Sequence, residues 1–237
     1  SGEGKSTVLS LIAGIIPNII PGEIWGKIFI DGEDISKHKM GDICRKVGVV
    51  LQNAEEQIVH QLVEDEIAFG CENFAFSQEK IQSRITRSCG YMKLHPAWKT
   101  RTLSGGQKQR LITACTLATE QKILVLDEPL ANLDKEGAIL LMETLRRLAK
   151  SGYAILLVEH RLDMVLPYVD AVWSIRAGKI SGVHDKEAYL SCQSEYIRDE
   201  CGTPSIGESG PIFQLEHTGF SVNGREILKD ISFTVKK

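Results

Sequence analysis

The stretch Ile123–Glu128, which reads ILVLDE, is an apolar run that ends in two carboxylates. An all-apolar run of this length is typical of a strand that is buried on both faces of a parallel sheet. Ligands bind at the carboxyl ends of such strands. We therefore expect Asp127 to hold Mg²⁺, directly or through water, and Glu128 to polarise an attacking water molecule. The competing interpretation is that the two acids only cap the next helix.

Two more buried runs lie on either side of this stretch in the sequence. Val47–Leu51 reads VGVVL, Ala154–Val158 reads AILLV, and Glu136–Lys150 has the spacing of an amphipathic helix. Strand, crossover helix and strand predict an α/β fold with a parallel sheet. Residues 54–101 are polar with helical spacing, and the runs around Ala177-Gly178 predict a closing hairpin.

The first seven residues, SGEGKST, match the end of the P-loop pattern G-x-x-x-x-G-K-[ST]. Glycines let the backbone approach phosphates closely, Lys5 reaches the β- and γ-phosphates, and the Ser6 hydroxyl can ligate Mg²⁺. The expected nucleotide-binding residues of this loop are Ser1, Gly2, Gly4, Lys5, Ser6 and Thr7. The first glycine of the pattern and its preceding strand are absent, so we expect the sequence to be a fragment. A flexible loop with a chance lysine is the alternative.

Leu103–Arg110, which reads LSGGQKQR, predicts a second anion-binding helix start. Ser104 can cap the helix, and Gly105 and Gly106 expose backbone N–H groups. One nucleotide does not need two such loops. Two facing copies of the domain do, because each loop can close over the γ-phosphate held by the other copy.

Together, GKST, LSGGQ and VLDE resemble the ATP-binding cassette (ABC) family. The resemblance implies a P-loop NTPase fold of the RecA-like type, with a parallel sheet, an antiparallel β edge and an inserted helical subdomain at residues 54–101. It also implies an ATPase that uses ATP and Mg²⁺.

The resemblance assigns further roles by position. Gln52 resembles the Q-loop glutamine that touches Mg²⁺, His160 the switch histidine, and Asp134 part of the D-loop that communicates across a cassette dimer. Catalysis is thereby expected of Glu128, His160 and Gln52, and metal ligation of Ser6, Gln52 and Asp127. Ser104, Gly105, Gly106 and Gln107 would serve the nucleotide of a partner cassette.

Val50–Val59 and Val63–Gly70, the latter reading VEDEIAFG, resemble the energy-coupling-factor importers of vitamins or transition metals such as cobalt and nickel. This resemblance implies a peripheral protein on the cytoplasmic face of the cell membrane. Its partners would be a transmembrane coupling subunit and a substrate-binding membrane subunit. No apolar run reaches the roughly 18 residues that a membrane span requires.

The C-terminal tail resembles the start of a second cassette, with Phe220 at the position of the adenine-stacking aromatic residue. We therefore divide the chain into a first cassette without its N-terminal strands (1–184), a helix and linker (185–211) and the opening strands of a second cassette (212–237). The tail, with Asn223-Gly224 at a turn, predicts a hairpin that can mimic the missing antiparallel strands. It stops before a replacement for the P-loop strand, so we expect that residues 1–237 alone do not form an active cassette.

Composition limits the competing functions. The net charge is −3 and no basic block occurs, so no nucleic-acid partner is expected. The six cysteines lie singly, which disfavours a cysteine-ligated metal site or a disulfide framework. A soluble tandem ATPase acting on ribosomes or DNA is the main alternative. Only roughly 50 residues, without sustained heptads, separate Gln52 from Ser104, and the linker is short and acidic. A nucleotide-gated module with little turnover is disfavoured by the presence of Glu128, Gln52 and His160.

Overall fold

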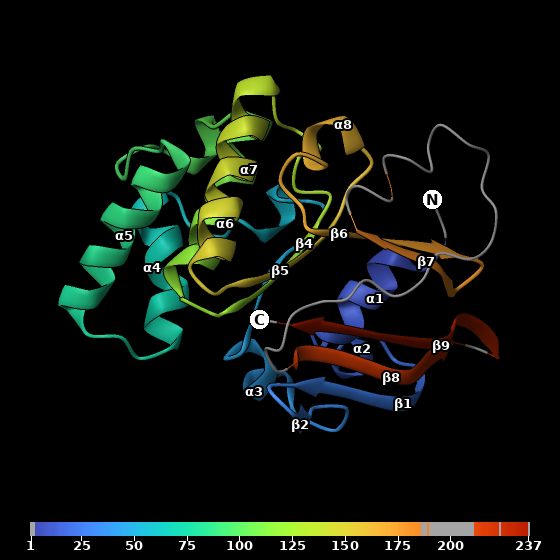
Figure 1. Cartoon of the computed structure of the whole chain (residues 1–237). Coiled ribbons are helices and arrows are strands. Elements are labelled where there is room, and N and C mark those ends of the chain that lie inside the picture. The colour runs from blue at the N-terminus through green and yellow to red at the C-terminus, as the bar shows by residue number, and fades with distance from the viewer. Residues whose placement is uncertain (1–2, 186–188, 190–210, 223, 237) are drawn as a thin grey trace. The chain divides into compact units, whose positions relative to one another are not determined.

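A computed structural model describes residues 3–185, 189, 211–222 and 224–236 (Figure 1). Ser1, Gly2 and nearly all of the helix and linker expected at 185–211 lie outside these described residues. The chain forms two compact units. One unit contains Arg45–Met164, and the other combines Ser1–Cys44 with Val165–Lys237.

A parallel sheet forms the centre of the unit Arg45–Met164. Its strands are β3 (Val47–Val50), β4 (Ile123–Asp127) and β5 (Ala154–Val158), in the order β3-β4-β5. Every residue of β4 is buried, as its all-apolar sequence requires of a central strand covered on both faces. The register sets Val50 opposite Leu126 and Asp127 opposite Val158. The parallel α/β sheet predicted from the three apolar runs is confirmed.

Helices cover this sheet and form the expected helical subdomain (Figure 1). α7 (Lys135–Lys150) connects β4 to β5 and buries the apolar stripe that its sequence predicts. The helical segments between β3 and β4 are η1 (Glu55–Gln57), α4 (Val63–Asn73), α5 (Gln78–Met92), η2 (Thr100–Thr102) and α6 (Gly105–Ala118). α4, α5 and α6 contact one another pairwise. The short helix α8 (Leu162–Val165) follows β5.

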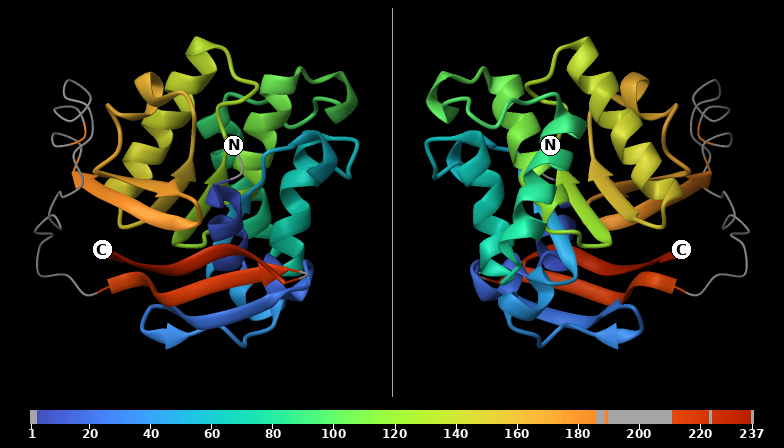
Figure 2. Two further views of the ribbon diagram at one scale, coloured as in Figure 1. Left: turned by 90° about the vertical axis from the view of Figure 1, so that its right-hand side faces the viewer. Right: turned by 90° about the vertical axis from the view of Figure 1, so that its left-hand side faces the viewer.

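The other unit is built on an antiparallel sheet in the order β2-β1-β8-β9. Its strands are β1 (Glu23–Ile30), β2 (Glu33–Asp34), β8 (Pro211–Val222) and β9 (Arg225–Lys236). Both views in Figure 2 show β8 and β9, from the end of the chain, alongside β1. Ile28 pairs with Leu215, and both side chains are buried. The C-terminal tail therefore forms the expected hairpin and completes a sheet with β1.

Among the described residues, three short helices and a second hairpin also belong to this unit. They are α1 (Lys5–Ile12), α2 (Ile15–Asn18), α3 (Met40–Cys44), β6 (Ala171–Arg176) and β7 (Lys179–Asp185). The predicted turn between β6 and β7 is present, with positive φ angles of 49° at Ala177 and 74° at Gly178. The backbone N–H of Lys229 in β9 donates to the carbonyl oxygen of Gly178 at 2.8 Å. Among the described residues, no helix has the length and apolar character needed to cross a bilayer.

Candidate functional site

The candidate catalytic carboxylate stands directly after the central strand β4. Glu128 has a φ of 48°, in the left-handed region that residues other than glycine rarely occupy. Its backbone N–H donates to the carbonyl oxygen of Val158 at 2.9 Å, so the end of β5 holds this conformation in place. Backbone conformations of this kind cluster at functional sites, where the surrounding structure maintains them.

Glu128 contacts both of the other residues that we predicted to be catalytic. The side-chain nitrogen Nε2 of Gln52 donates to Oε2 of Glu128 at 2.9 Å. Nε2 of His160 lies 3.2 Å from Oε1 of the same carboxylate. The Glu128 side chain is 24% exposed and that of His160 55% exposed, so the group is open to an incoming ligand. Asp127, at the last position of β4, is 8% exposed.

Side chains that the sequence did not single out shape the loop that carries Gln52. Nε2 of Gln57 donates to the carbonyl oxygens of Leu51 at 3.2 Å and Asn53 at 2.9 Å, which closes the loop on itself. Lys108, in the first turns of α6, forms an ion pair with Glu55 in η1. The loop of Gln52 is thereby tied to the helix that begins at the LSGGQ motif.

Ser104 caps α6 as its sequence predicts, and Gln107 completes a capping box with it. The Ser104 hydroxyl accepts the N–H of Gln107 at 3.3 Å, and Oε1 of Gln107 accepts the N–H of Ser104 at 2.8 Å. Gly106 approaches the segment before α7 so closely that a Cβ there would lie 2.8 Å from the carbonyl oxygen of Asn132. Asp134 caps α7 by accepting the N–H of Gly137 at 2.8 Å. These glycine and aspartate positions therefore have structural roles beside the predicted functional ones.

Lys5, Ser6 and Thr7 of the P-loop form the start of α1 in the other unit. Gly4 precedes the helix with a φ of 94°, no side chain caps the helix, and its first turn holds no acidic residue. A helix N-terminus with these properties favours an anion. Lys5 is half-buried and Ser6 is exposed. Gly4 is buried against β9, because a Cβ there would lie 2.6 Å from a methyl carbon of Leu228.

Phe220 lies in β8, where it is 4% exposed. A Cβ on Gly22 would meet its ring at 2.2 Å, which shows how closely the backbone of that glycine covers the ring. Phe220 therefore serves here as a packing residue of the antiparallel sheet. Adenine stacking by Phe220 stays a prediction that belongs to a second cassette.

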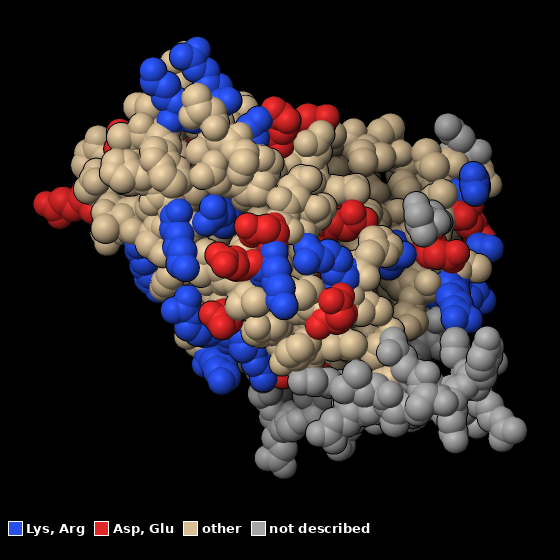
Figure 3. Space-filling view, turned by 90° about the horizontal axis from the view of Figure 1, so that it is seen from above, with Lys and Arg blue, Asp and Glu red and all other residues tan. Residues whose placement is uncertain are grey.

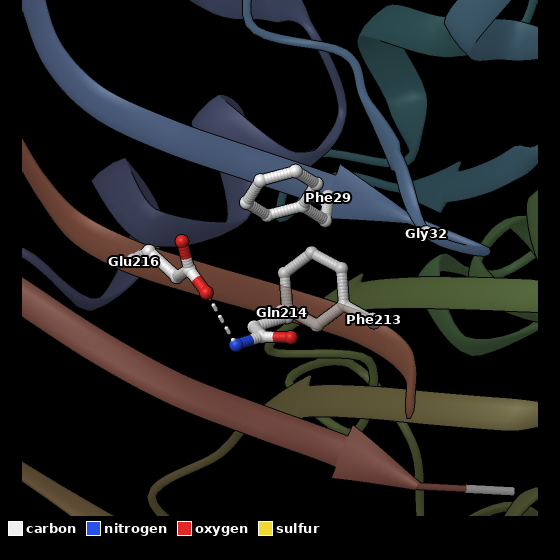
Figure 4. A pocket seen from close by; sticks show the side chains of 5 residues that line it. All are labelled: Phe29, Gly32, Phe213, Gln214 and Glu216. Carbon is white, nitrogen blue, oxygen red and sulfur yellow. Dashed lines mark hydrogen bonds between the residues drawn. The ribbon is translucent and has the colours of Figure 1, made fainter. Parts of the chain in front are cut away.

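A shallow pocket of about 230 Å³ lies elsewhere on this sheet, between Phe29 and Phe213 (Figure 4). Gly32, Gln214 and Glu216 complete its lining, and Nε2 of Gln214 donates to Oε1 of Glu216 at 2.9 Å. None of the predicted nucleotide-binding residues lines it. On the face shown in Figure 3, acidic and basic side chains are interspersed over much of the surface.

The predicted metal ligands have the donor chemistry of a magnesium site. Ser6, Gln52 and Asp127 offer a hydroxyl, an amide and a carboxylate oxygen, and oxygen is the donor that Mg²⁺ prefers. Because the Gln52 nitrogen donates to Glu128, the amide oxygen is the atom left to meet a cation. In the described residues no group of three or more His, Cys, Asp or Glu gathers as a metal cluster. Mg²⁺ commonly relies instead on one or two protein carboxylates and the phosphates of its substrate.

Solved structures of cassette proteins share this fold. CbiO1 from Clostridium perfringens, described as part of the ABC transporter complex CbiONQ, has a TM-score of 0.71 and 27% sequence identity, over 81% of this chain and 77% of that one. The ATP-binding cassette MJ0796, a dimer bound to ADP and Pi in a post-hydrolysis state, has a TM-score of 0.68 and 21% identity, over 78% of this chain and 81% of that one. At that identity the second likeness shows the fold alone.

Sequence relatives extend well beyond this chain. A provisionally named ABC transporter ATP-binding protein of Saccharolobus solfataricus is 39% identical over 184 residues, which are 76% of this chain and 34% of the relative. A protein of Pyrococcus abyssi with the same kind of name is 37% identical over 186 residues, 76% of this chain and 65% of the relative. This chain thus spans about a third of the length of the first of these relatives.

The sequence profile of the family described as ABC transporter matches residues 1–131, which is more than half of the chain. This matched region includes the P-loop, the LSGGQ motif, the β4 strand and Glu128. The motifs, the parallel sheet and the profile agree, and the chain belongs to the ABC transporter family.

Proposed function

We propose that this chain binds ATP and hydrolyses it to drive an ABC transporter. The observation that carries the proposal is the contact of Glu128 with both Gln52, at 2.9 Å, and His160, at 3.2 Å. The three side chains come from the ends of three strands, and phosphoryl transfer needs an oriented nucleophile and stabilised charge at one place. Two acids that only capped a helix would not be expected to contact both Gln52 and His160.

Each residue has a distinct task in this proposal. Lys5 and the uncapped start of α1 bind the phosphates, as the charge of the helix terminus favours. Glu128 accepts a hydrogen bond from the attacking water, while His160 donates to the γ-phosphate. Mg²⁺, held by Ser6, Gln52 and Asp127, would neutralise charge on the phosphate oxygens. Ser104, Gly105, Gly106 and Gln107 would close over the nucleotide of a partner cassette.

The test of the enzymatic part is steady-state release of phosphate by the full-length protein. We expect turnover that requires Mg²⁺ and ceases when a chelator is added. Lys5→Ala should abolish ATP binding, whereas Lys37→Ala, at a site outside all of the motifs, should retain both binding and turnover. ATP binding without turnover in the unmodified protein would favour the nucleotide-gated module instead.

We further propose that the transporter is an importer of the energy-coupling-factor type, for a vitamin or a transition metal ion. The support is the VEDEIAFG stretch and the 27% identity to CbiO1, which belongs to a CbiONQ complex. The segment between Gln52 and Gly70 also exposes large apolar side chains, with Val59 68% and Phe69 45% exposed. Such a surface suits a transmembrane coupling subunit, and the protein would then lie peripherally on the cytoplasmic face of the membrane.

A tandem arrangement of two cassettes in one chain is the third part of the proposal. Its support is the resemblance of residues 212–237 to the start of a cassette. The S. solfataricus and P. abyssi relatives also have room for further domains, since this chain covers 34% and 65% of them. The second cassette, or an equivalent subunit, would provide its own LSGGQ motif, here called the signature loop, to close over the ATP bound by the first.

Co-purification tests the transport part of the proposal. The full-length protein would be isolated from gently solubilised membranes, and its companions would be identified by mass spectrometry. We expect a polytopic membrane subunit that is lost when Val59 and Phe69 are both changed to Ser. The matched control changes Ile19 and Trp25, two other exposed apolar residues, to Ser and should retain the subunit. Recovery of ribosomal proteins instead would support the soluble ATPase.

A further inference from the structure

Both neighbours of His160 in the chain make contacts that the proposed catalysis does not use. Oε1 of Glu159 accepts the backbone N–H of Leu130 at 2.7 Å. Oε2 of the same carboxylate accepts the N–H of His160 at 2.9 Å and that of Arg161 at 3.3 Å. One carboxylate thus joins residues 159–161, which we call the switch loop because they include His160, to residues 130–133 (LANL), which we call the D-loop segment because they lead into Asp134.

Arg161 holds the same segment at both of its ends. Its Nη1 atom donates to the carbonyl oxygen of Leu130 at 3.2 Å and to that of Leu133 at 3.0 Å. The side chain of Leu130 is fully buried and that of Leu133 is 7% exposed, so little water reaches their backbone groups. Buried backbone groups need such partners, and a charged partner strengthens the hydrogen bond. The D-loop segment therefore depends on two side chains of the switch loop for its conformation.

The D-loop segment lies between two functional elements. It begins two residues after Glu128, whose carbonyl oxygen accepts the N–H of Ala131 at 3.1 Å. At its other end, the carbonyl oxygen of Asn132 lies where it leaves no room for a side chain on Gly106 of the LSGGQ motif. A shift of the D-loop segment would therefore change the contacts of both the catalytic carboxylate and the signature loop.

We propose that Glu159 and Arg161 are positioning residues that lock the D-loop segment to the switch loop. This lock couples Glu128 and His160 of one ATP site to the signature loop that closes over the other ATP site. The existence of the lock follows from this chain's contacts alone. Its effect on turnover rests on the proposed function.

Hydrogen exchange of the full-length protein, followed by mass spectrometry, tests the lock without reference to activity. Glu159→Gln replaces two carboxylate oxygens with one amide oxygen, so the three N–H groups can no longer all be accepted. We expect exchange across residues 130–133 to become about tenfold faster, the effect of losing roughly one charged hydrogen bond. Glu143→Gln, an exposed site on α7, is the matched control and should leave it unchanged. Unchanged exchange in Glu159→Gln would overturn the proposal.

Arg161→Lys provides a second variant in case Glu159→Gln does not fold. A single ammonium does not reproduce the planar guanidinium between two carbonyl oxygens. We expect the kcat for ATP to fall about tenfold with the KM within about twofold, as positioning of transition-state groups predicts. Arg147→Lys, whose guanidinium contacts Thr144 on its own helix, is the control.

The double variant separates one shared lock from two unrelated effects. Residues that act through the same segment are not additive, so the variant with both changes should be no slower than the slower single variant. Multiplied losses, or an unaltered kcat in Arg161→Lys, would overturn the coupling. If the unmodified protein shows no Mg-dependent turnover, the proposed function fails, and the exchange experiment still decides whether the lock exists.

Discussion

Nε2 of Gln52 lies 2.9 Å from Oε2 of Glu128, although 76 positions separate the two residues in the sequence. The contact arises because β3 and β4 are parallel neighbours, with Val50 opposite Leu126, and both residues follow the carboxyl ends of their strands. Parallel strands thus bring loops that are distant in sequence to one edge of the sheet. A movement of the loop after β3 would change the hydrogen bonding of Glu128 directly.

His160→Ala should lower turnover far more than nucleotide affinity. The imidazole lies 3.2 Å from Glu128 and is 55% exposed, so its removal leaves the fold intact but removes a donor from the reacting group. We expect the kcat to fall about 100-fold while the KM changes by less than about threefold. Phosphate release at saturating ATP measures this. His95→Ala, also exposed but remote from the motifs, should behave like the unmodified protein. Equal losses in the two variants would refute the role given to His160.

Replacing Gly105 or Gly106 by Ala should have different effects on protein stability, although both glycines are expected to serve nucleotide binding. A Cβ on Gly106 would lie 2.8 Å from the carbonyl oxygen of Asn132, whereas the nearest atom to a Cβ on Gly105 is at 3.6 Å, an ordinary contact. Gly106→Ala should therefore lower the free energy of unfolding by about 1–3 kcal/mol, as overpacking does, and Gly105→Ala should not. Denaturant titration of both variants checks this, and equal stabilities would contradict the close packing.

The parallel sheet could be predicted because it depends on local patterns, whereas the roles of Gln52 and His160 were implied only by the resemblance to the ABC family and stay predictions. β3, β4 and β5 are short all-apolar runs, and Gln52, Glu128 and His160 each follow one of them. The pairing of β8 with β1 was harder to predict, since 187 positions separate Ile28 from Leu215 and no local pattern selects the partner strand. The hairpin itself was predictable from its turn residues.

The supporting side chains of the site were missed for a different reason. Glu159, Arg161 and Gln57 form hydrogen bonds with backbone groups. The residues next to them in the sequence do not indicate which backbone groups these are. The structural role of Glu66, in contrast, could have been inferred from the sequence. Together with Val63 and Ile67, Glu66 occupies one face of α4 at helical spacing, so an acid stands at a position that should be apolar.

Replacing Glu66 by Gln should destabilise the protein less than replacing it by Ala. The Glu66 side chain is 5% exposed, and a single oxygen, Oε2, accepts the N–H groups of Val59 at 3.0 Å and His60 at 2.6 Å. Glu66→Gln keeps an oxygen for both donors, whereas Glu66→Ala leaves them unsatisfied at a cost of about 2 kcal/mol. We expect Glu66→Ala to lower the Tm by about 4–8 °C and Glu66→Gln by much less. Similar Tm values for the two variants would show that Oε2 does not hold this segment.

Buried thiols should resist modification in the native protein. Burial raises the pKa of the Cys89 thiol from 9.0 to about 11, and burial also raises the pKa of Cys115 well above its usual value. Because the thiolate is the reactive form, only about 0.1% of Cys89 is reactive at pH 8. Among the thiols that the structure describes, a thiol reagent at pH 8 should therefore label the partly exposed Cys44 before the buried Cys89, which should react only after unfolding.

The raised pKa of the Cys89 thiol also determines whether stability rises or falls with pH. A thiol whose pKa is higher in the folded state contributes stability that is fully present below pH 9 and is lost as the pH rises toward about 11. Stability measured by denaturant titration should thus decline over that range. Native labelling of Cys89 at the rate of Cys44 would contradict the burial on which both expectations rest.

Turnover by Glu128→Gln in the full-length protein tests the central claim most directly, with the other ATP site disabled. The amide keeps the shape of the side chain but can no longer polarise water, so we expect ATP to bind normally, turnover to fall about 1,000-fold, and a closed, ATP-bound state to accumulate. Glu143→Gln provides the matched control on an exposed face of α7. Turnover by Glu128→Gln at the rate of the unmodified protein would contradict the assignment of Glu128 as the catalytic carboxylate.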